Sequence, residues 1–418
     1  MNRAEPGAAG AGRAPLWKNR DYMLLWSGQV ASALGSSAAS LIYPLLILAI
    51  TNSPGAAGLA AALRALPYLL FSLPVGALVD RWNRKHVMVA CDLLRAAVVL
   101  TLPLAIGFAT LTLWHVYAVC LVEGSLFVFF NLAEVAALSR VVPAADLPRA
   151  AAQNEAAFGA ALIAGPPLGT LLFQALGRGA PFVVDALSYL VSAASLWRIR
   201  TDFHPVPVTG RRRLLGEIRE GVVWLWHQPL IRFMAFLTGA MNFVYAATPL
   251  LLIVLATEMG ASAIEVGIVF SIGGVSGIVG ALIGGRIQRR FRFGQVIVAV
   301  VWAQALLFPL YLLVPGFYGL GVVYALIYTL APVYNVVQFS YRLALIPDAL
   351  QGRVNSSFRL LAFGFNPLGA ALCGLLLESF GSTPTVLAFA AFYALMAVLT
   401  QLNGPVRRAQ PVAELPAR

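Results

Sequence analysis

The sequence predicts an all-α integral membrane protein, with twelve transmembrane helices in two pseudo-symmetric six-helix bundles around a central cavity. Hydrophobic residues make up 60% of the 418 residues and charged residues 11%, whereas a soluble domain is about 25% charged. Such a chain cannot cover a water-facing surface, so we expect lipid around it. Backbone groups in lipid must bond internally, which leaves helices or a closed barrel, and the apolar runs are too long for barrel strands.

A helix that crosses a bilayer needs about 20 apolar residues, and twelve such runs follow one another along the chain. The predicted spans are 22–50, 57–79, 87–109, 113–138, 153–176, 180–199, 229–256, 264–286, 294–314, 317–342, 354–379 and 384–402. They divide the chain into an N-terminal tail (1–21), a first bundle (22–199), a linker (200–228), a second bundle (229–402) and a C-terminal tail (403–418).

The basic residues indicate the orientation in the membrane. All 29 Lys and Arg residues except Arg64, Arg95 and Arg178 fall on the termini or on the even-numbered connections. By the positive-inside rule both termini are cytoplasmic, and we expect a multi-pass protein of the plasma or inner membrane. The basic residues form small clusters between spans, which argues against nucleic-acid binding. The linker is predicted to be either an amphipathic helix on the membrane surface or a tether.

Three sequence patterns occur twice, in the same order and at nearly constant spacing. Gly76–Arg84 recurs as Gly284–Arg292 after 208 residues, and Pro143–Arg149 recurs as Pro347–Arg353 after 204 residues. Pro167–Gly169 recurs as Pro367–Gly369 after 200 residues. Parallel repeats of this kind are typical of transporters, in which the substrate path runs between the two halves.

These patterns also carry a family resemblance. Gly76-Ala-Leu-Val-Asp80-Arg81-Trp-Asn-Arg84-Lys85 resembles the cytoplasmic signature of the major facilitator superfamily, and Gly165-Pro-Pro-Leu-Gly169 resembles the fifth-helix antiporter motif of its drug exporters. Asp92-Leu-Leu-Arg95 and Asp185-Ala-Leu-Ser-Tyr189 resemble the branch of macrolide-efflux proteins and enterobactin exporters. The resemblance implies an exporter that works by alternating access.

The signature residues Gly76, Asp80, Arg81, Arg84 and Lys85 form a candidate cytoplasmic latch. A carboxylate at this helix end can pair with arginines and with the positive N-terminus of a neighbouring helix. Such a contact would stabilise one access state and break in the other. The alternative is a basic loop that only fixes the topology.

Acidic side chains inside the spans are candidates for proton coupling, since a charge there costs about 2.5–3.5 kcal/mol. The resembling branch commonly carries an acid after a glycine in the first helix, but here Ser36 and Ser37 follow Gly35. We therefore expect coupling through Glu123, about 15 Å deep in the fourth span, helped by Glu134 about 20° around the same helix. A carboxylate neutralised by a structural hydrogen bond is the alternative.

Three further groups have both a mechanistic and a structural interpretation. Asp185 is a third candidate for proton coupling, or a structural hydrogen-bonding group. Asp92 and Arg95 are i,i+3 neighbours that we expect to brace the third span as a self-contained pair, with a substrate site as the alternative. The fifth span contains residues that allow either a hinge or close helix packing, namely Gly165, Pro166 and Gly169.

Polar and aromatic residues recur on single helical faces, which in lipid would be wasteful and in a water-filled cavity would bind substrate. Small residues such as serine also mediate helix packing, so the first-span stripe has a structural alternative. The predicted cavity residues are Gln29, Ser32, Ser36, Ser40, Tyr43, Phe127, Asn131, Asn242, Tyr245, Tyr324, Tyr328, Asn335, Gln338, Arg342, Phe363 and Asn366. Together with the acids they favour a bulky amphipathic or cationic organic substrate.

The leading hypothesis is a monomeric, proton-coupled exporter of a drug, siderophore or secondary metabolite. A facilitative or import transporter of a metabolite or lipid, including a flippase, is the alternative, and a non-transporting sensor or scaffold is a third possibility. The sequence shows no nucleophile motif and no phosphate-binding loop, so we do not expect an enzyme. Three cysteines without metal-ligand spacing predict neither a disulfide framework nor a zinc site, and we expect no metal and no cofactor.

Overall fold

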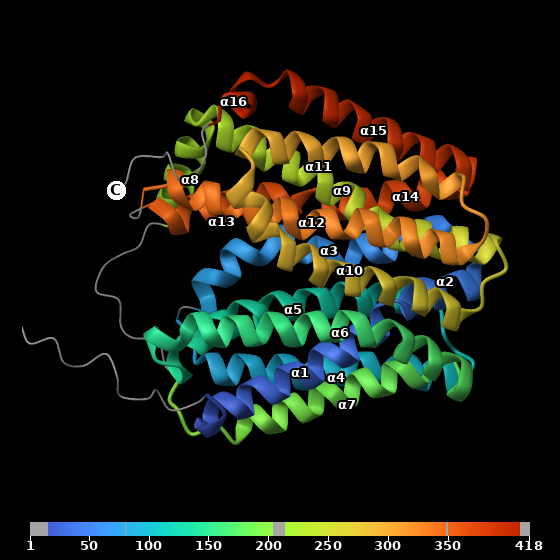
Figure 1. Ribbon diagram of the computed structural model, residues 1–418. Coiled ribbons are helices and arrows are strands. Elements are labelled where there is room, and N and C mark those ends of the chain that lie inside the picture. Colours follow the sequence, from blue (N-terminus) through green and yellow to red (C-terminus); the bar gives the residue numbers. More distant parts are fainter. Residues whose placement is uncertain (1–15, 80, 204–213, 348–349, 410–418) are drawn as a thin grey trace, which may run out of the picture.

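The computed structural model describes residues 16–79, 81–203, 214–347 and 350–409 (Figure 1). Within these residues twelve spans are long and apolar enough to cross a membrane, and the regular structure is helical throughout. The twelve-helix prediction is therefore confirmed. The predicted span ends lie within a few residues of the helix ends, because hydropathy follows burial in lipid closely.

The first six spans form the N-terminal half, in which the first span is broken at Leu41. Its helices are α1 (Arg20–Ser40) with α2 (Ile42–Thr51), α3 (Pro54–Val79), α4 (Arg84–Gly107), α5 (Leu113–Val141), α6 (Leu147–Leu176) and α7 (Ala180–Trp197). The short 3-10 helices η1 (Leu16–Lys18) and η2 (Ala144–Asp146) precede α1 and α6.

The last six spans form the C-terminal half. They are α9 (Pro229–Glu258), α10 (Ala263–Arg290), α11 (Phe293–Leu307) with η3 (Phe308–Leu312), α12 (Phe317–Leu345), α13 (Gln351–Gly364) with α14 (Asn366–Phe380), and α15 (Ser382–Leu402). The linker contributes helix α8 (Leu214–His227), and α16 (Gly404–Arg407) follows the last span.

Local sequence signals explain where several helices start and stop. The Asn83 side chain accepts hydrogen bonds from the backbone N–H groups of the first turn of α4, and Ser262 and Glu265 form a capping box at α10. Such side chains satisfy N–H groups that have no partner within the helix. Gly177 and Gly381 follow α6 and α14 with φ of 92° and 81°, a backbone conformation that favours glycine.

The two halves repeat the same packing, as the sequence repeat predicts. In the N-terminal half α1 packs on α6, α3 on α5 and α4 on α7, and in the C-terminal half α9 packs on α14, α10 on α12 and α11 on α15. The repeated Pro-Leu-Gly segments occupy equivalent places. A Cβ on Gly169 would lie 2.0 Å from the carbonyl oxygen of Ala38 in α1, and one on Gly369 would lie 1.9 Å from that of Phe243 in α9.

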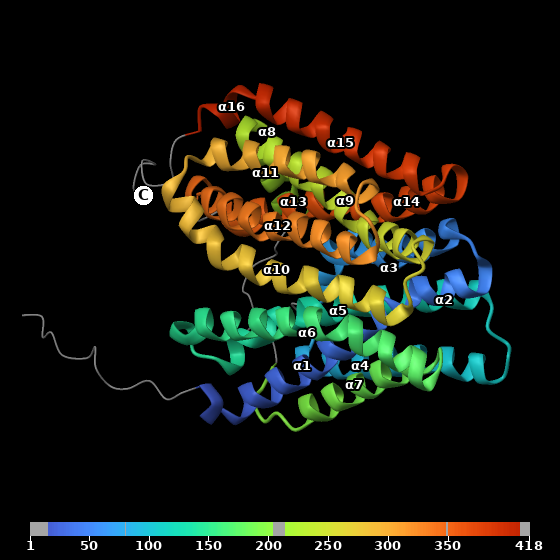
Figure 2. The ribbon, with the colours of Figure 1, turned by 45° about the vertical axis from the view of Figure 1, so that its right-hand side comes forward.

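Helices α8 and α16 lie at one end of the molecule, the linker end (Figure 1). The halves meet most closely at the opposite end, through α3 against α14 and α6 against α10 (Figure 2). There Gly58 and Gly374 allow the backbones of α3 and α14 to touch, since a Cβ on Gly58 would lie 2.8 Å from the Cα of Gly374. Glu378 Oε2 also accepts hydrogen bonds across the halves from Ser53 Oγ (2.7 Å) and the Gly55 N–H (2.8 Å).

The linker helix α8 packs on α13 and α9, so it is attached to the C-terminal half. Arg353 Nη1 lies 2.5 Å from Glu220 Oε2, and Leu225 is buried while Val222, Val223 and Trp226 are exposed. The predicted helix in the linker is thus present with one apolar side against the protein and another apolar side exposed.

We predict that Gly169→Ala and Gly369→Ala each lower the melting temperature of the protein in detergent. The added methyl group has no room between the packed helices, and overpacking costs about 1–3 kcal/mol. Gly159→Ala in the same helix as Gly169 is the matched control, because its added methyl group would meet no atom of another helix within 4 Å and alanine favours helix formation. Equal melting temperatures for Gly169→Ala and Gly159→Ala would contradict the close contact.

Candidate functional site

A cavity of about 1040 Å³ lies between the two halves. Its wall is formed by helices α1, α2, α3, α5 and α6 of the N-terminal half and by α9, α10, α12, α13 and α14 of the C-terminal half. Small-molecule sites commonly enclose about 300–1,000 Å³. The space is therefore sufficient for a bulky organic molecule.

Many of the residues selected from the sequence reach this cavity. Those that line it are Ser40, Tyr43, Glu123, Phe127, Asn131, Tyr245, Tyr324, Tyr328, Phe363 and Asn366. They come from both halves and from helices that are far apart in the sequence. Their common position follows from the helical spacing and from the symmetric arrangement of the halves.

Other predicted lining residues on the C-terminal half lie outside the cavity. Gln338 and Arg342 are buried at the linker end, where α9, α11 and α13 cover the C-terminal part of α12. The Arg342 guanidinium carbon lies 3.9 Å from the centre of the Phe358 ring in α13. Asn335 is exposed, and Asn242 donates to the carbonyl oxygen of Ala362 at 2.8 Å. The face of α12 that carries Tyr324 and Tyr328 therefore does not continue along the cavity in the residues after Pro332.

The predicted stripe on α1 and the second acid on α5 are also corrected. Gln29, Ser32 and Ser36 do not line the cavity, because α1 packs on α6 and α7 along this part of its length. Only the C-terminal end of α1 and the following α2 reach the open space. Glu134 is absent from the lining as well, although Asn131, one turn earlier on α5, is part of it.

The two walls of the cavity differ in chemistry. Four aromatic residues form a cluster on the C-terminal half, with ring centres 5.9 Å apart for Tyr245 and Tyr328, 5.3 Å for Tyr324 and Tyr328, and 5.5 Å for Phe270 and Tyr324. The N-terminal wall carries Arg64, Glu123 and Glu155. The cavity is thus amphipathic across its width.

One cation also enters the cavity from the C-terminal half. Arg359 of α13 donates from Nη2 to the hydroxyl oxygen of Tyr68 in α3 at 2.7 Å. This contact joins the two halves within the cavity wall, and the ring of Tyr68 lies edge-on to that of Phe363 with centres 6.1 Å apart.

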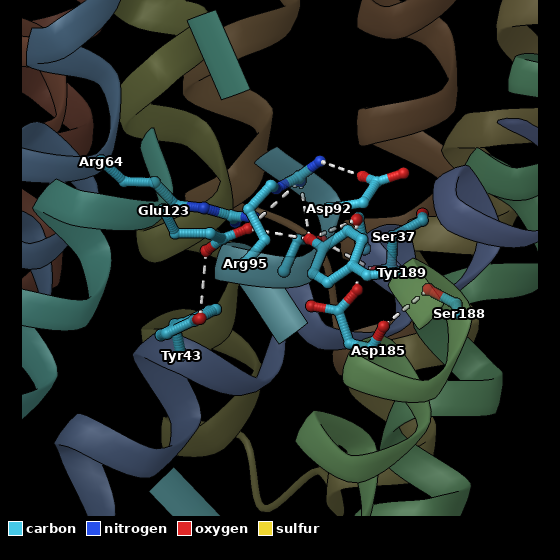
Figure 3. A network of polar contacts seen from close by, with 11 residues as sticks. Ser37, Tyr43, Arg64, Asp92, Arg95, Glu123, Asp185, Ser188 and Tyr189 are labelled. Atoms are coloured by element: carbon cyan, nitrogen blue, oxygen red, sulfur yellow. Dashed lines mark hydrogen bonds and ion pairs between the residues drawn. The ribbon is translucent and has the colours of Figure 1, made fainter. Parts of the chain in front are cut away.

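The Glu123 carboxylate is surrounded by four polar side chains (Figure 3). Its Oε1 lies 2.8 Å from Arg64 Nη2 and 3.6 Å from Arg95 Nη2, and the Tyr189 hydroxyl donates to the same oxygen at 3.1 Å. The Tyr43 hydroxyl donates to Oε2, also at 3.1 Å. Helices α2, α3, α4, α5 and α7 thus each place one side chain in this cluster.

A second carboxyl group is linked to the first through hydroxyl groups. Arg95 Nη2 donates to the Tyr189 hydroxyl oxygen at 2.6 Å, and that oxygen lies 2.8 Å from Ser36 Oγ. Ser36 Oγ in turn lies 3.2 Å from Asp185 Oδ1. Ser36, which does not line the cavity, is therefore part of the charged cluster behind it.

Asp92 completes the group, with Oδ1 3.9 Å from Arg95 Nη1. The predicted Asp92–Arg95 pair is present, but it is not isolated, because Arg95 also contacts Glu123 and Tyr189. Asp92, Glu123 and Asp185 are at most 1% exposed. The cluster thus holds three buried carboxyl groups and two guanidinium groups.

Sequence reasoning missed Arg64 as a site residue and treated it as an exception to the charge pattern. A charged residue in the interior of a span was the available signal, since such residues are rarely placed in lipid without a function. Tyr189 entered only as part of a family resemblance. Its role depends on the packing of α7 on α1 and α4, which the sequence spacing does not show.

The other predicted groups lie in the N-terminal half and are not members of the cluster. Gly165 and Gly169 of α6 face α1, where a Cβ on Gly165 would lie 2.4 Å from Ser37 Oγ, and Pro166 lines the cavity. Among the latch residues, Lys85 Nζ donates to the carbonyl oxygen of Ile199 at 2.7 Å and Arg84 Nη1 to that of Ala136 at 3.3 Å. Gly76 lies near the C-terminal end of α3 and Arg81 in the turn between α3 and α4, and Asp80 lies outside the described residues.

The sequence has characterised relatives of similar length. It is 28% identical over 397 residues to the multidrug efflux pump Tap of Mycolicibacterium fortuitum, covering 91% of this chain and 95% of the relative. It is 24% identical to macrolide efflux protein A of Streptococcus pyogenes, covering 94% and 98%. The resemblance noted from the motifs is thereby confirmed.

The fold also matches that of solved transporters. A bacterial homologue of the human lysosomal transporter Spinster, in an inward-facing and unoccupied conformation, superposes with a TM-score of 0.74 at 13% identity, over 94% of this chain and 97% of that one. The family profile described as Major Facilitator Superfamily matches residues 25–365. The chain therefore belongs to the major facilitator superfamily, a family of transporters rather than of enzymes.

Proposed function

We propose that this transporter exports a bulky amphipathic organic compound in exchange for protons, by alternating access. The observation that carries the proposal is the cavity between the halves. The wall formed by the N-terminal half contains Arg64 and Glu123 of the buried cluster, and the wall formed by the C-terminal half is aromatic. A substrate and a proton-binding group thus share one space. The efflux function named for two relatives supports the direction of transport.

The two walls favour an amphipathic substrate over a sugar-like one. Aromatic faces bind apolar or flat groups and attract cations, and the opposite wall offers hydroxyl and charged groups. Such binding tolerates variation in the apolar part of the molecule. A drug, a siderophore or another secondary metabolite has this division of surfaces.

Alternating access is supported by the unequal packing of the two ends. The halves touch through glycine pairs and the Glu378 contact at the end opposite the linker. We assign the linker end to the cytoplasm of the plasma or inner membrane because its connections carry most of the basic residues. We infer that this state loads substrate from the cytoplasm. We propose that the protein acts as a monomer and that the latch of Gly76, Asp80, Arg81, Arg84 and Lys85 acts in the opposite state.

Proton coupling is supported by the composition of the cluster. Its carboxyl groups outnumber its guanidinium groups, and an unpaired charge buried in a protein is costly. The side chain of Arg64 is 27% exposed whereas that of Glu123 is 1% exposed, so a substrate in the cavity can contact Arg64 more readily than Glu123. A movement of Arg64 would change the charge balance around Glu123.

We predict that wild-type protein in proteoliposomes moves protons when erythromycin or ethidium is added on one side. Glu123→Gln is expected to remove this proton movement and the pH dependence of transport, because the amide cannot exchange a proton. Glu258→Gln, at an exposed position with no role in the cluster, is the matched control. Wild-type transport at the same rate without a proton gradient would favour a facilitative transporter, and an unchanged pH dependence in Glu123→Gln would refute the role of Glu123.

We also predict that Tyr328→Ala weakens ethidium binding by about tenfold, corresponding to about 1.4 kcal/mol. The substitution removes one ring from the aromatic wall, and aromatic contacts contribute about 0.5–1.5 kcal/mol beyond their buried area. Tyr318→Ala, an exposed tyrosine in the same helix, should bind ethidium like the wild type in fluorescence titrations. If both variants bind with equal affinity, the aromatic wall is not the binding surface.

A further inference from the structure

An unbroken series of oxygen–oxygen contacts links the carboxyl group of Glu123 in α5 to that of Asp185 in α7. Glu123 Oε1, the Tyr189 hydroxyl, Ser36 Oγ and Asp185 Oδ1 follow one another at 3.1, 2.8 and 3.2 Å. The side chains of Glu123, Tyr189 and Asp185 are labelled in Figure 3. The first acid lines the cavity and the second is fully buried. We propose that Tyr189 and Ser36 form a proton relay through which Asp185 stores the proton that Glu123 exchanges with the cavity.

Counting hydrogen atoms along the series shows that it holds one extra proton. Three contacts between oxygens need three hydrogen atoms, and the two hydroxyl groups supply one each. The Arg95 guanidinium donates to the Tyr189 oxygen, which occupies an acceptor position and adds no hydrogen to the series. With both acids ionised, one contact would bring two oxygens together without a hydrogen between them. A proton on either Glu123 or Asp185 completes all three bonds.

The charge count gives the same number independently. Arg64 and Arg95 are positive, and ionised Asp92 and Glu123 balance them, so the cluster is neutral when Asp185 carries a proton. An additional uncompensated charge buried in this environment would be strongly unfavourable. The hydrogen count requires one proton on the series itself, and the charge count agrees with it, because three carboxyl groups and two guanidinium groups are neutral when one of the carboxyl groups carries a proton.

The surroundings of the two acids place this proton on Asp185. Glu123 contacts both guanidinium groups and two tyrosine hydroxyls, which stabilise its ionised form. Asp185 forms no ion pair among the described residues, and its Oδ2 is buried without a hydrogen-bond partner. The bonds then run in one direction, from the Asp185 O–H to Ser36, from Ser36 to Tyr189 and from Tyr189 to Glu123.

Transfer along the series requires no other reactant. The proton of Asp185 moves to Ser36 Oγ, the Ser36 hydrogen moves to the Tyr189 oxygen, and the Tyr189 hydrogen moves to Glu123 Oε1. Three O–H bonds break and three form, and the net result is one proton moved from Asp185 to Glu123. Movement of Arg64 away from Glu123, as on substrate contact in the cavity, would favour this direction because Glu123 loses a stabilising cation.

The position of the stored proton is tested by infrared spectroscopy of the purified protein, without any transport. The wild-type spectrum should contain a protonated carboxyl band that Asp185→Asn removes and Glu258→Gln keeps. Persistence of the complete band in Asp185→Asn would overturn the assignment of the proton to Asp185. Because this measurement needs no substrate, it remains decisive even if the proposed proton-coupled export is wrong.

The relay is tested in proteoliposomes with Tyr189→Phe, which keeps the ring that lies 4.0 Å from the Arg95 guanidinium and removes only the hydroxyl. We expect proton-driven ethidium transport to fall by on the order of 10²-fold, while ethidium exchange without a proton gradient continues. Ser36→Ala should behave likewise and Ser36→Thr should restore transport.

Ser188→Ala is the matched control for these variants, since its hydroxyl donates to the backbone carbonyl oxygen of Asp185 at 2.7 Å and lies outside the series. It should leave both proton-driven transport and exchange at wild-type rates. An equal loss of transport and exchange in Tyr189→Phe would show a structural role for the hydroxyl and would reject the relay. Unchanged proton-driven transport in Tyr189→Phe would reject it as well.

Discussion

The organisation of the N-terminal half depends on keeping the Glu123 carboxylate between two guanidinium groups. A buried carboxylate without counter-charges would be expensive in a bundle surrounded by lipid, so Arg64 of α3 and Arg95 of α4 must approach α5 closely. Tyr43 and Tyr189 then fill the remaining acceptor positions from α2 and α7. One ion cluster therefore fixes the relative positions of most helices in this half, and loss of either arginine would leave a buried charge unpaired.

The two halves share their geometry but not their chemistry. The Pro-Leu-Gly segments of α6 and α14 make equivalent backbone contacts, and the helix pairs correspond throughout. The space that holds ionisable groups in the N-terminal half is matched by aromatic rings in the C-terminal half. The proposed proton-coupled export would use this division, with protons acting on one half and the apolar part of the substrate binding to the other.

The fold was more predictable from the sequence than the site. Span positions follow from hydropathy, and span ends such as Ala180 and Leu402 agree with the predicted limits to within a residue, since lipid imposes the same requirement on every outward face. The central part of the cavity was also predictable, because Glu123, Tyr324 and Tyr328 are unusual residues at mid-span. Gln338 and Arg342 continue the same helical face, yet neighbouring helices cover them. Spacing along one helix cannot reveal such coverage, and the partner of Arg64, Glu123, lies on another helix.

The serines after Gly35 acquire a physical meaning in this arrangement. The absence of an acid at this position of the first helix shifted the expected coupling site to α5. The structure shows that α1 and α7 touch at Gly35, where a Cβ would lie 3.1 Å from the Cα of Asp185 and 2.3 Å from Ser188 Oγ. This close approach lets the short Ser36 side chain reach both Asp185 and Tyr189. An acid contributed by α7 is thereby connected to the cavity through a hydroxyl on α1, so the first helix keeps a part in the cluster without carrying the charge itself.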